Sequence, residues 1–419
     1  MKKADRLSEK FFSVFNCTVF LVSLISVLYV FVGIYLQVGF EGIKILMGTD
    51  FRSLYEEMSL FLQTGVLYKP DDNIFFNTPF MTFLGIPYTL IPFPEAKSIK
   101  LLLIITIYGV SIGIIRSPSY APDPRNKNLL LGVICFTITF FVVQFYLLNV
   151  YTEVMFCLLL SLYFYKKNRP VLCAFFLSLA VAFKIFLLPL LIVPLLARRY
   201  GIFGYTVMFA MIFFIIALAL FGTGFPGDMA HSIAKDYVRL KVELFHKYIP
   251  QVFLYAGLQD IPLKMYVKKI ISFDAVGRYT LLITILYAIS SLVLCLRIFI
   301  VSGRHAARDA YPEIFATVLI LILVFVFRYD FGIFFLPIMP VVINMKKIGT
   351  PVLKAILLMG IVYLFLYDLL QYLGMSIPAD LFYLVIPQVW IGFFLYASLF
   401  YYWFAVGGPS TQAGGPARD

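Results

Sequence analysis

Apolar stretches long enough to cross a membrane recur along almost the whole chain, and they restrict its fold more than any other feature. A bilayer core about 30 Å thick requires about 20 apolar residues per helix. With 62% hydrophobic and 13% charged residues, no soluble domain of ordinary size fits beside such stretches. The sequence therefore predicts an all-α polytopic membrane protein with about twelve transmembrane helices. The expected spans cover residues 12–37, 97–115, 128–147, 150–165, 170–185, 186–197, 202–222, 280–300, 312–327, 331–345, 350–370 and 380–404.

Lysine and arginine residues mark one side of the predicted membrane. Cytoplasmic loops are enriched in these residues, and here the N-terminal segment and alternate loops are basic. The basic residues of these loops are Arg116, Arg125, Lys127, Lys166, Lys167, Arg169, Arg198, Arg199, Arg304, Arg308, Lys346 and Lys347. The pattern predicts a multi-pass plasma-membrane protein with both termini in the cytoplasm. It requires that residues 79–93, which contain three prolines, form an interfacial or re-entrant segment.

Two long loops are then expected on the extracytoplasmic face, at residues 38–96 and 223–279. Since the cytoplasmic loops are short, we expect function on the outer face. The first loop belongs to a predicted catalytic module, residues 1–222, and the second to a module at 223–404, followed by a disordered tail at 405–419. The second loop is strongly basic, which indicates an anionic lipid headgroup or glycan partner.

Asp50 is the first candidate for chemistry, because it directly follows the first apolar stretch. Apolar residues recur at helical spacing after it, for example Phe51, Leu54 and Met58, so the segment is expected to be an amphipathic helix on the outer surface. A helix N-cap is the alternative role for Asp50. Both roles are compatible, since a cap position holds a carboxylate rigidly.

Four short motifs lie in roughly the first 220 residues. They are Thr49-Asp50-Phe51, Thr64-Gly65-Val66-Leu67-Tyr68, Phe75-Phe76-Asn77-Thr78-Pro79-Phe80, and the run from Ser178 through Lys184 and Pro189 to Arg199. Together they resemble the integral-membrane GT-C glycosyltransferases, in particular the polyprenyl-phosphate-mannose-dependent mannosyltransferases. One departure is that family members often place Tyr before the proline where this chain has Asn77-Thr78.

The resemblance implies a GT-C architecture with amphipathic juxtamembrane helices in the first outer loop, and it assigns the general base to Asp50. A sugar hydroxyl that attacks an anomeric carbon must lose a proton, and a fixed carboxylate can accept it. The leaving polyprenyl phosphate needs cations that stabilise its charge.

Three cations are candidates for contact with the donor phosphate: Lys184, Arg328 and Arg52. Lys184 lies toward the outer end of its span, where an ammonium facing lipid would be costly. Snorkelling to the interface is the alternative. Arg328, in Arg328-Tyr329-Asp330, presents a guanidinium suited to phosphate, or else forms a local pair with Asp330. Arg52 is a supporting candidate close to Asp50.

Polar residues in the outer loops and turns are candidates for binding the sugar or the acceptor. They are Tyr55, Tyr68, Asn77, Gln144, Asn149, His231 and His246. Gln144 and Asn149 flank an outer turn together with Glu153, where turn capping is an equal alternative. The alternative role for each histidine is a solvated loop residue. Glu56 and Glu57 are alternative candidates for the catalytic carboxylate, or else they form the polar face of the helix.

The predicted function is therefore an inverting glycosyltransferase that moves a monosaccharide, mannose in the first instance, from a polyprenyl-phosphate donor to a lipid-linked or envelope glycan on the extracytoplasmic face. The expected partners are that donor, that acceptor and membrane lipid, with no nucleic acid. No metal or other cofactor is expected, because Asp71-Asp72 resembles a loop turn and no other acidic or histidine cluster offers ligands. The alternative is a twelve-span transporter or flippase for an anionic lipid-linked substrate.

Overall fold

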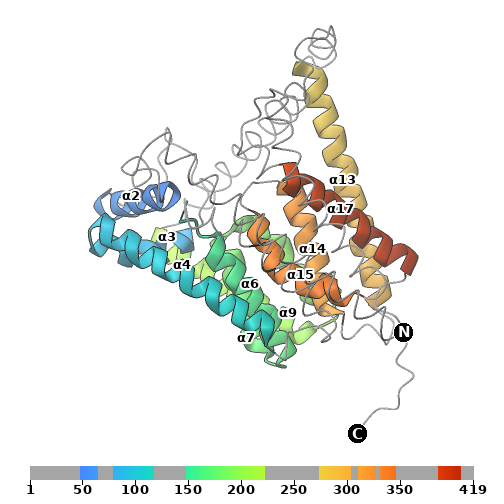
Figure 1. Cartoon of the computed structure of the whole chain (residues 1–419), viewed down its shortest axis with the longest axis horizontal. Helices are drawn as coiled ribbons and strands as arrows, with labels where there is room; N and C mark the ends of the chain where they lie inside the picture. Colours follow the sequence, from blue (N-terminus) through green and yellow to red (C-terminus); the bar gives the residue numbers. More distant parts are fainter. Residues whose placement is uncertain are drawn as a thin grey trace, which may run out of the picture.

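The computed structural model describes residues 48–64, 79–117, 134, 137, 148–221, 273–302, 310–326, 331–345 and 386–406. All regular secondary structure in these ranges is helical, which confirms the predicted all-α class (Figure 1). The expected spans at 12–37 and 350–370 lie outside the described residues, and 128–147 is described only at two positions.

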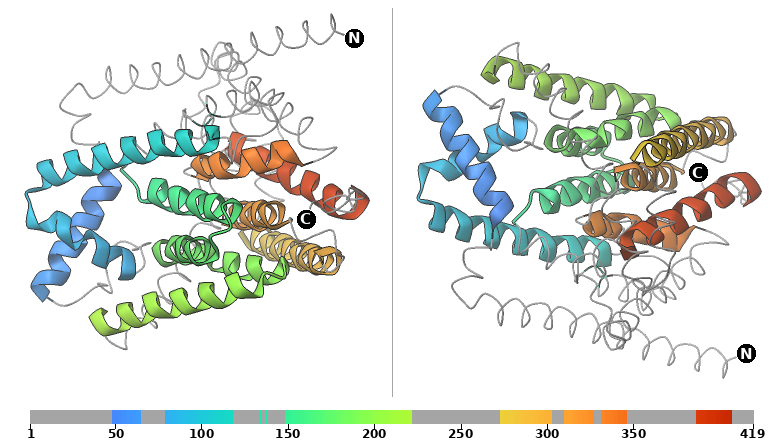
Figure 2. Two further views of the ribbon diagram at one scale, coloured as in Figure 1. Left: turned by 90° about the horizontal axis from the view of Figure 1, so that it is seen from below. Right: turned by 90° about the horizontal axis from the view of Figure 1, so that it is seen from above.

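Four helices form one half of the structure: α4 (Phe93–Arg116), α6 (Tyr151–Lys166), α7 (Pro170–Phe183) and α9 (Tyr200–Phe221). Helices α4 and α9 lie along opposite edges with α6 and α7 between them (Figure 2). Small hydroxyls join neighbouring helices: the Ser161 hydroxyl donates to the Cys173 carbonyl at 3.0 Å, and Ser178 donates to the Thr206 carbonyl at 2.9 Å. Small polar residues of this kind allow helices in lipid to approach closely.

The chain reverses direction after α7, at Lys184. It returns as the 3-10 helix η3 (Ile185–Ile192) and the short helix α8 (Val193–Leu196). The expected span at 186–197 is therefore largely a 3-10 helix, since Pro189 inside it lacks the N–H that an α-helix requires. Helix α7 and the η3–α8 segment are the two arms of a hairpin, and each is about 21 to 22 Å long. They therefore cover the same length of the bundle in opposite directions.

The hairpin formed by α7 and the η3–α8 segment connects the two ends of the bundle, as its contacts with α6 show. Lys184 lies over Tyr151 at the start of α6, with its Nζ 4.9 Å from the ring centroid. Arg199 donates to the Tyr165 hydroxyl near the end of α6, at 3.0 Å. We call the first the Asp50 end, since Asn149 there contacts Asp50. The other is the basic end, which carries Lys166, Lys167, Arg169, Arg198 and Arg199.

The later helices pack on this first group. They are α13 (Phe273–Ser302), α14 (Tyr311–Val326), η7 (Phe331–Phe334), α15 (Phe335–Asn344), α17 (Ile386–Tyr401) and η9 (Tyr402–Val406). Tyr311 stacks on Tyr165 at the basic end, with ring centroids 4.1 Å apart, and Phe334 meets Tyr151 at the Asp50 end, at 5.9 Å. In the described part of the chain, the predicted modules 1–222 and 223–404 thus share one hydrophobic core.

Helix α2 (Thr49–Thr64) runs across the Asp50 end, at a steep angle to α4 (Figure 2). Its buried face is Phe51, Leu54 and Met58, which confirms the predicted amphipathic helix. It packs on α3 (Pro79–Gly85) and η1 (Ile86–Leu90), where a Cβ on Gly85 would lie 2.0 Å from the Met58 sulfur. Residues 79–93 thus form a short helix and a 3-10 turn rather than one long helix, in keeping with the predicted interfacial or re-entrant segment.

Within the described ranges, α4 and residues Tyr200–Leu220 of α9 are long and apolar enough to cross a membrane. Both helices expose many large apolar side chains, and so does α13. The most exposed include Leu102, Ile105, Met211, Ile215, Leu292 and Ile300. Exposed apolar faces of this extent are typical of surfaces that contact membrane or partner proteins, and here they accompany helices of spanning length.

Candidate active site

Asp50 and Asn149 lie side by side although 99 positions separate them in the sequence. The Asn149 Nδ2 donates a hydrogen bond to the Asp50 Oδ2 at 2.5 Å. Helix α2 begins at Thr49, so Asp50 stands within the first helical turn rather than in front of the helix. Negative charge is favourable at this position because the helix N-terminus carries a partial positive charge. The carboxylate is thus held by its helix and by an amide from a second element.

Two backbone positions in the left-handed region bring these residues together. Gly48 has φ +85° and Leu148 has φ +52°, and each immediately precedes the site segment that it orients. A Cβ on Gly48 would lie 3.0 Å from the Leu148 Cδ1, so the two turns touch. A branched or bulky residue adopts a positive φ only when its surroundings enforce it, and such strain concentrates at functional sites.

Lys184 reaches the same end of the bundle. Its side chain is 4% exposed, and its ammonium faces the ring of Tyr151, two residues after Asn149. Phe186 and Phe334 surround the same ring, at centroid distances of 6.2 Å and 5.9 Å. A cation over an aromatic face is stabilised by the ring quadrupole. Lys184 is therefore buried in an aromatic cluster at the same end of the bundle as the Asp50–Asn149 pair, and it does not snorkel to the surface.

A second buried cation lies at this end and was not predicted as a site residue. Lys100 of α4 is 1% exposed and forms an ion pair with the Glu153 Oε1 of α6. Its ammonium also lies 6.0 Å from the centroid of the Phe51 ring, next to Asp50 in the sequence. The other oxygen of Glu153, Oε2, has no hydrogen-bond partner among the described residues. An ionisable residue inside a predicted span was the signal that would have indicated Lys100.

Tyr88 of η1 borders this ion pair. Burial and the nearby Glu153 charge raise the pKa of Tyr88 to about 12, so its hydroxyl stays protonated at neutral pH. The Tyr88 ring meets Phe51 edge to face, with centroids 5.2 Å apart. The segment between α3 and α4 therefore packs against Phe51, the residue after Asp50.

The rival carboxylates on α2 differ from Asp50. Glu56 pairs with Arg52 on the exposed side of the helix, at 2.7 Å, so Arg52 points away from the buried face. Burial raises the pKa of Glu57 to about 8, and its Oε2 has no hydrogen-bond partner among the described residues. A carboxyl group that is mostly protonated at neutral pH is a poor general base. Asp50, by contrast, accepts a hydrogen bond from Asn149, which lies in the turn before α6.

The structure describes few of the predicted sugar or acceptor residues. Tyr55 donates its hydroxyl to the Ile91 carbonyl at 2.8 Å, and its ring packs on Phe93, at 5.3 Å, so it joins α2 to the start of α4. Outside the described residues lie Tyr68, Asn77, Gln144, His231, His246 and Arg328. Among residues whose positions are described, no three His, Cys, Asp or Glu side chains gather as a metal site would require.

Exposed apolar helices of spanning length, with a polar site at one end of the bundle, are the organisation of a membrane-embedded enzyme. The chain belongs to Glycosyltransferase family 87, whose model matches residues 75–328. This is a GT-C family of polyprenyl-phosphate-sugar-dependent membrane glycosyltransferases, so the protein is a polytopic membrane glycosyltransferase. The match includes Lys100, Asn149 and Lys184, whereas Asp50 precedes it. No curated protein and no solved structure matches the chain.

Proposed function

We propose that this glycosyltransferase moves mannose, with inversion, from a polyprenyl-phosphate donor to a lipid-linked or envelope glycan. The observation that carries the proposal is the hydrogen bond of 2.5 Å between Asn149 and Asp50, at the end of the bundle where Lys184 lies. A carboxylate for the acceptor and a cation for the donor phosphate are the two groups that the reaction needs.

In the proposed reaction, Asp50 accepts the proton of the acceptor hydroxyl while that oxygen attacks the anomeric carbon of the donor. The bond from that carbon to the phosphate oxygen breaks, and the polyprenyl phosphate leaves with the electron pair. Lys184 stabilises the negative charge that develops on the leaving group. Asn149 keeps the Asp50 carboxylate oriented, since its amide donates a hydrogen bond to the Asp50 Oδ2.

The proposal places the Asp50 end on the extracytoplasmic face. Support comes from the opposite end, where Lys166, Lys167 and Arg169 in one turn lie beside Arg198 and Arg199 in the next. Cytoplasmic turns carry such an excess of Lys and Arg. The turns at the Asp50 end that are described, around Gly48, Leu148 and Lys184, carry no comparable cluster.

The donor is tested with the full-length protein purified in nanodiscs and supplied with membrane acceptor lipids. We expect labelled mannose to transfer from polyprenyl-phosphate β-mannose and the product to carry an α linkage by nuclear magnetic resonance. Nucleotide-activated mannose alone should give no product. Transfer from the nucleotide sugar, or a product with retained configuration, would refute the proposed donor or the inverting mechanism, respectively.

Replacing Lys184 with Met should lower kcat/KM for the donor by about 10²- to 10³-fold, the usual cost of removing one preorganised charge stabiliser. The methionine keeps most of the buried stem on Tyr151 and removes the ammonium. Lys167→Met is the matched control, because Lys167 is exposed at the opposite end of α6. Steady-state kinetics of both variants measure this effect. If kcat/KM of Lys184→Met equals that of wild type, Lys184 does not bind the donor phosphate.

A further inference from the structure

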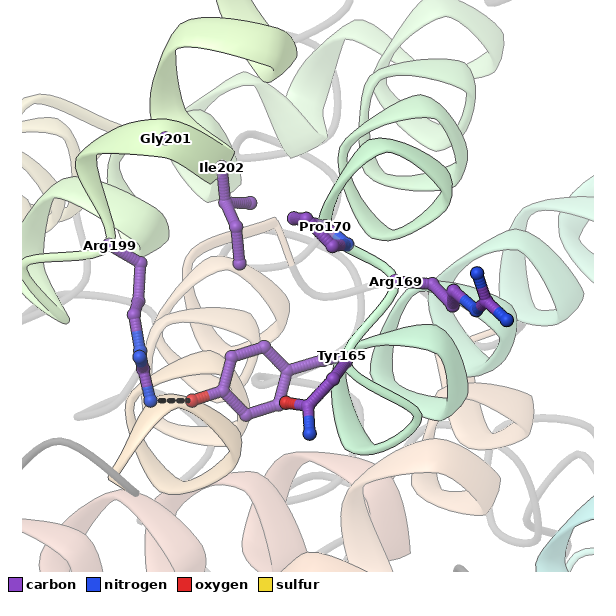
Figure 3. A pocket seen from close by; sticks show the side chains of 7 residues that line it. Tyr165, Arg169, Pro170, Arg199, Gly201 and Ile202 are labelled. Atoms are coloured by element: carbon purple, nitrogen blue, oxygen red, sulfur yellow. Dashed lines mark hydrogen bonds between the residues drawn. The ribbon is translucent and has the colours of Figure 1, made fainter.

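A pocket of about 360 Å³ lies at the basic end, far from the Asp50 site. Tyr165, Asn168, Arg169, Pro170, Arg199, Gly201 and Ile202 line it. Arg199 donates to the Tyr165 hydroxyl at 3.0 Å, while Arg169 lies at the other rim and extends outward (Figure 3). The pocket therefore combines one guanidinium held on the Tyr165 ring with a second that is exposed to solvent.

Two turns of the same construction form this pocket. In each, one residue takes a positive φ, Asn168 at 53° and Arg198 at 55°, and the arginine after it donates its backbone N–H to a carbonyl of the preceding helix. Each arginine then stands directly before a new helix, α7 at Pro170 and α9 at Tyr200. The repeated geometry places Arg169 and Arg199 in equivalent positions around the pocket.

The backbone adds to the positive potential of the two guanidinium groups. The first N–H groups of a helix lack partners within it, and both α7 and α9 begin at the pocket. Gly201 has open space where a Cβ would stand, so the backbone at the start of α9 is accessible. Glu313, a carboxylate at this end, lies within electrostatic range of Lys166 and does not line the pocket.

These features suit a phosphate group, which accepts hydrogen bonds from both guanidinium and backbone N–H donors. We infer that the pocket binds a phosphate group, with Arg199 as the fixed partner and Arg169 closing over it. Basic pockets between membrane helices bind the headgroups of anionic lipids, and free inorganic phosphate has the same chemistry. This site lies beyond the glycosyltransferase reaction, since its residues are at the opposite end of the bundle from Asp50.

Arginine-selective modification by phenylglyoxal, mapped by mass spectrometry on the whole protein in phosphatidylcholine nanodiscs, tests the inference. Phosphatidic acid in the disc, or inorganic phosphate in solution, should slow the reaction of Arg169 about tenfold once either exceeds its dissociation constant about tenfold. Arg198 is the internal control, because it is exposed in the neighbouring turn and lies over the Phe299 ring instead, at 5.0 Å. Protection by phosphatidic acid alone identifies a lipid headgroup, and protection by both identifies a general phosphate site.

A second readout uses variants that should fold. Phosphatidic acid in the disc should raise the unfolding temperature of wild type and of Arg198→Gln, but not of Arg169→Gln, whose side chain is exposed. Equal protection of Arg169 and Arg198 by either ligand would overturn the inference, since it would report only the charge of the membrane surface. Absence of protection by both ligands would overturn it as well.

Discussion

Replacing Asp50 with Asn will reduce mannose transfer by about 10²- to 10⁴-fold, the contribution typical of a positioned general base. The substitution keeps the shape of the side chain, and the new amide oxygen still accepts the hydrogen bond from the Asn149 Nδ2. In the proposed mechanism, what it removes is the ability to take the acceptor proton. The measurement is the rate of transfer from polyprenyl-phosphate mannose by purified protein in nanodiscs at matched concentrations.

Glu56→Gln is the matched control for this experiment. Like Asp50→Asn, this substitution removes a carboxylate from α2. Glu56 is exposed, however, and its ion pair with Arg52 contributes little to stability at a surface. We expect its transfer rate to stay within about twofold of wild type. If Asp50→Asn retained full activity while folded, Asp50 would not be the base, and the proposed mechanism would fail at its central step.

Replacing Lys100 with Met will destabilise the protein by about 3 to 5 kcal/mol, the cost of leaving a buried charge without its partner. Lys100 is 1% exposed and the Glu153 side chain is 13% exposed, so water has little access to the remaining carboxylate. Because α4 and α6 meet through this pair beside Phe51, the Asp50 site should loosen at the same time. Thermal unfolding in nanodiscs measures the first effect, and kcat measures the second.

The double variant Lys100→Met/Glu153→Gln separates a lost interaction from a lost packing contact. It removes both charges, so most of the stability lost in Lys100→Met should return. We expect most of the lost stability to return, because the buried Glu153 carboxylate is poorly satisfied even in the intact pair. Its Oε2 has no hydrogen-bond partner among the described residues. A double variant as unstable as the single one would show that the unpaired Glu153 carboxylate is not the cause of the lost stability.

Periodicity and local chemistry were sufficient to predict several parts of the structure. Phe51, Leu54 and Met58 recur at helical spacing, and these side chains are the buried face of α2. The position of Asp50 at the start of that helix followed from the same pattern. Lys184 was a candidate because an ammonium that faces lipid toward the outer end of its span would be costly, and the structure places it over the ring of Tyr151.

Other features could not be predicted, because they depend on contacts between distant segments. The hydrophobic run from Ile185 to Leu196 has the composition of a spanning α-helix, but its prolines and its packing on α7 and α14 produce a 3-10 helix. Lys100 is an ionisable residue inside an expected span, but only the packing of α4 on α6 places Glu153 next to it. A sequence pattern predicts which face of a helix is buried, but it does not predict which segment packs against that face.

Composition and residue spacing are enough to establish that this chain is a helical membrane protein, that one end of its helices is basic, and that Asp50 lies at the start of an amphipathic helix. These properties depend on composition and on spacing over a few turns, so local reading is enough. Contacts between distant segments bring Asn149 to Asp50, bring Lys184 to the same end, and bring Arg169 and Arg199 to one pocket. Each of these contacts forms only after the chain has reversed direction and distant segments have packed together, and a local sequence pattern does not predict that packing.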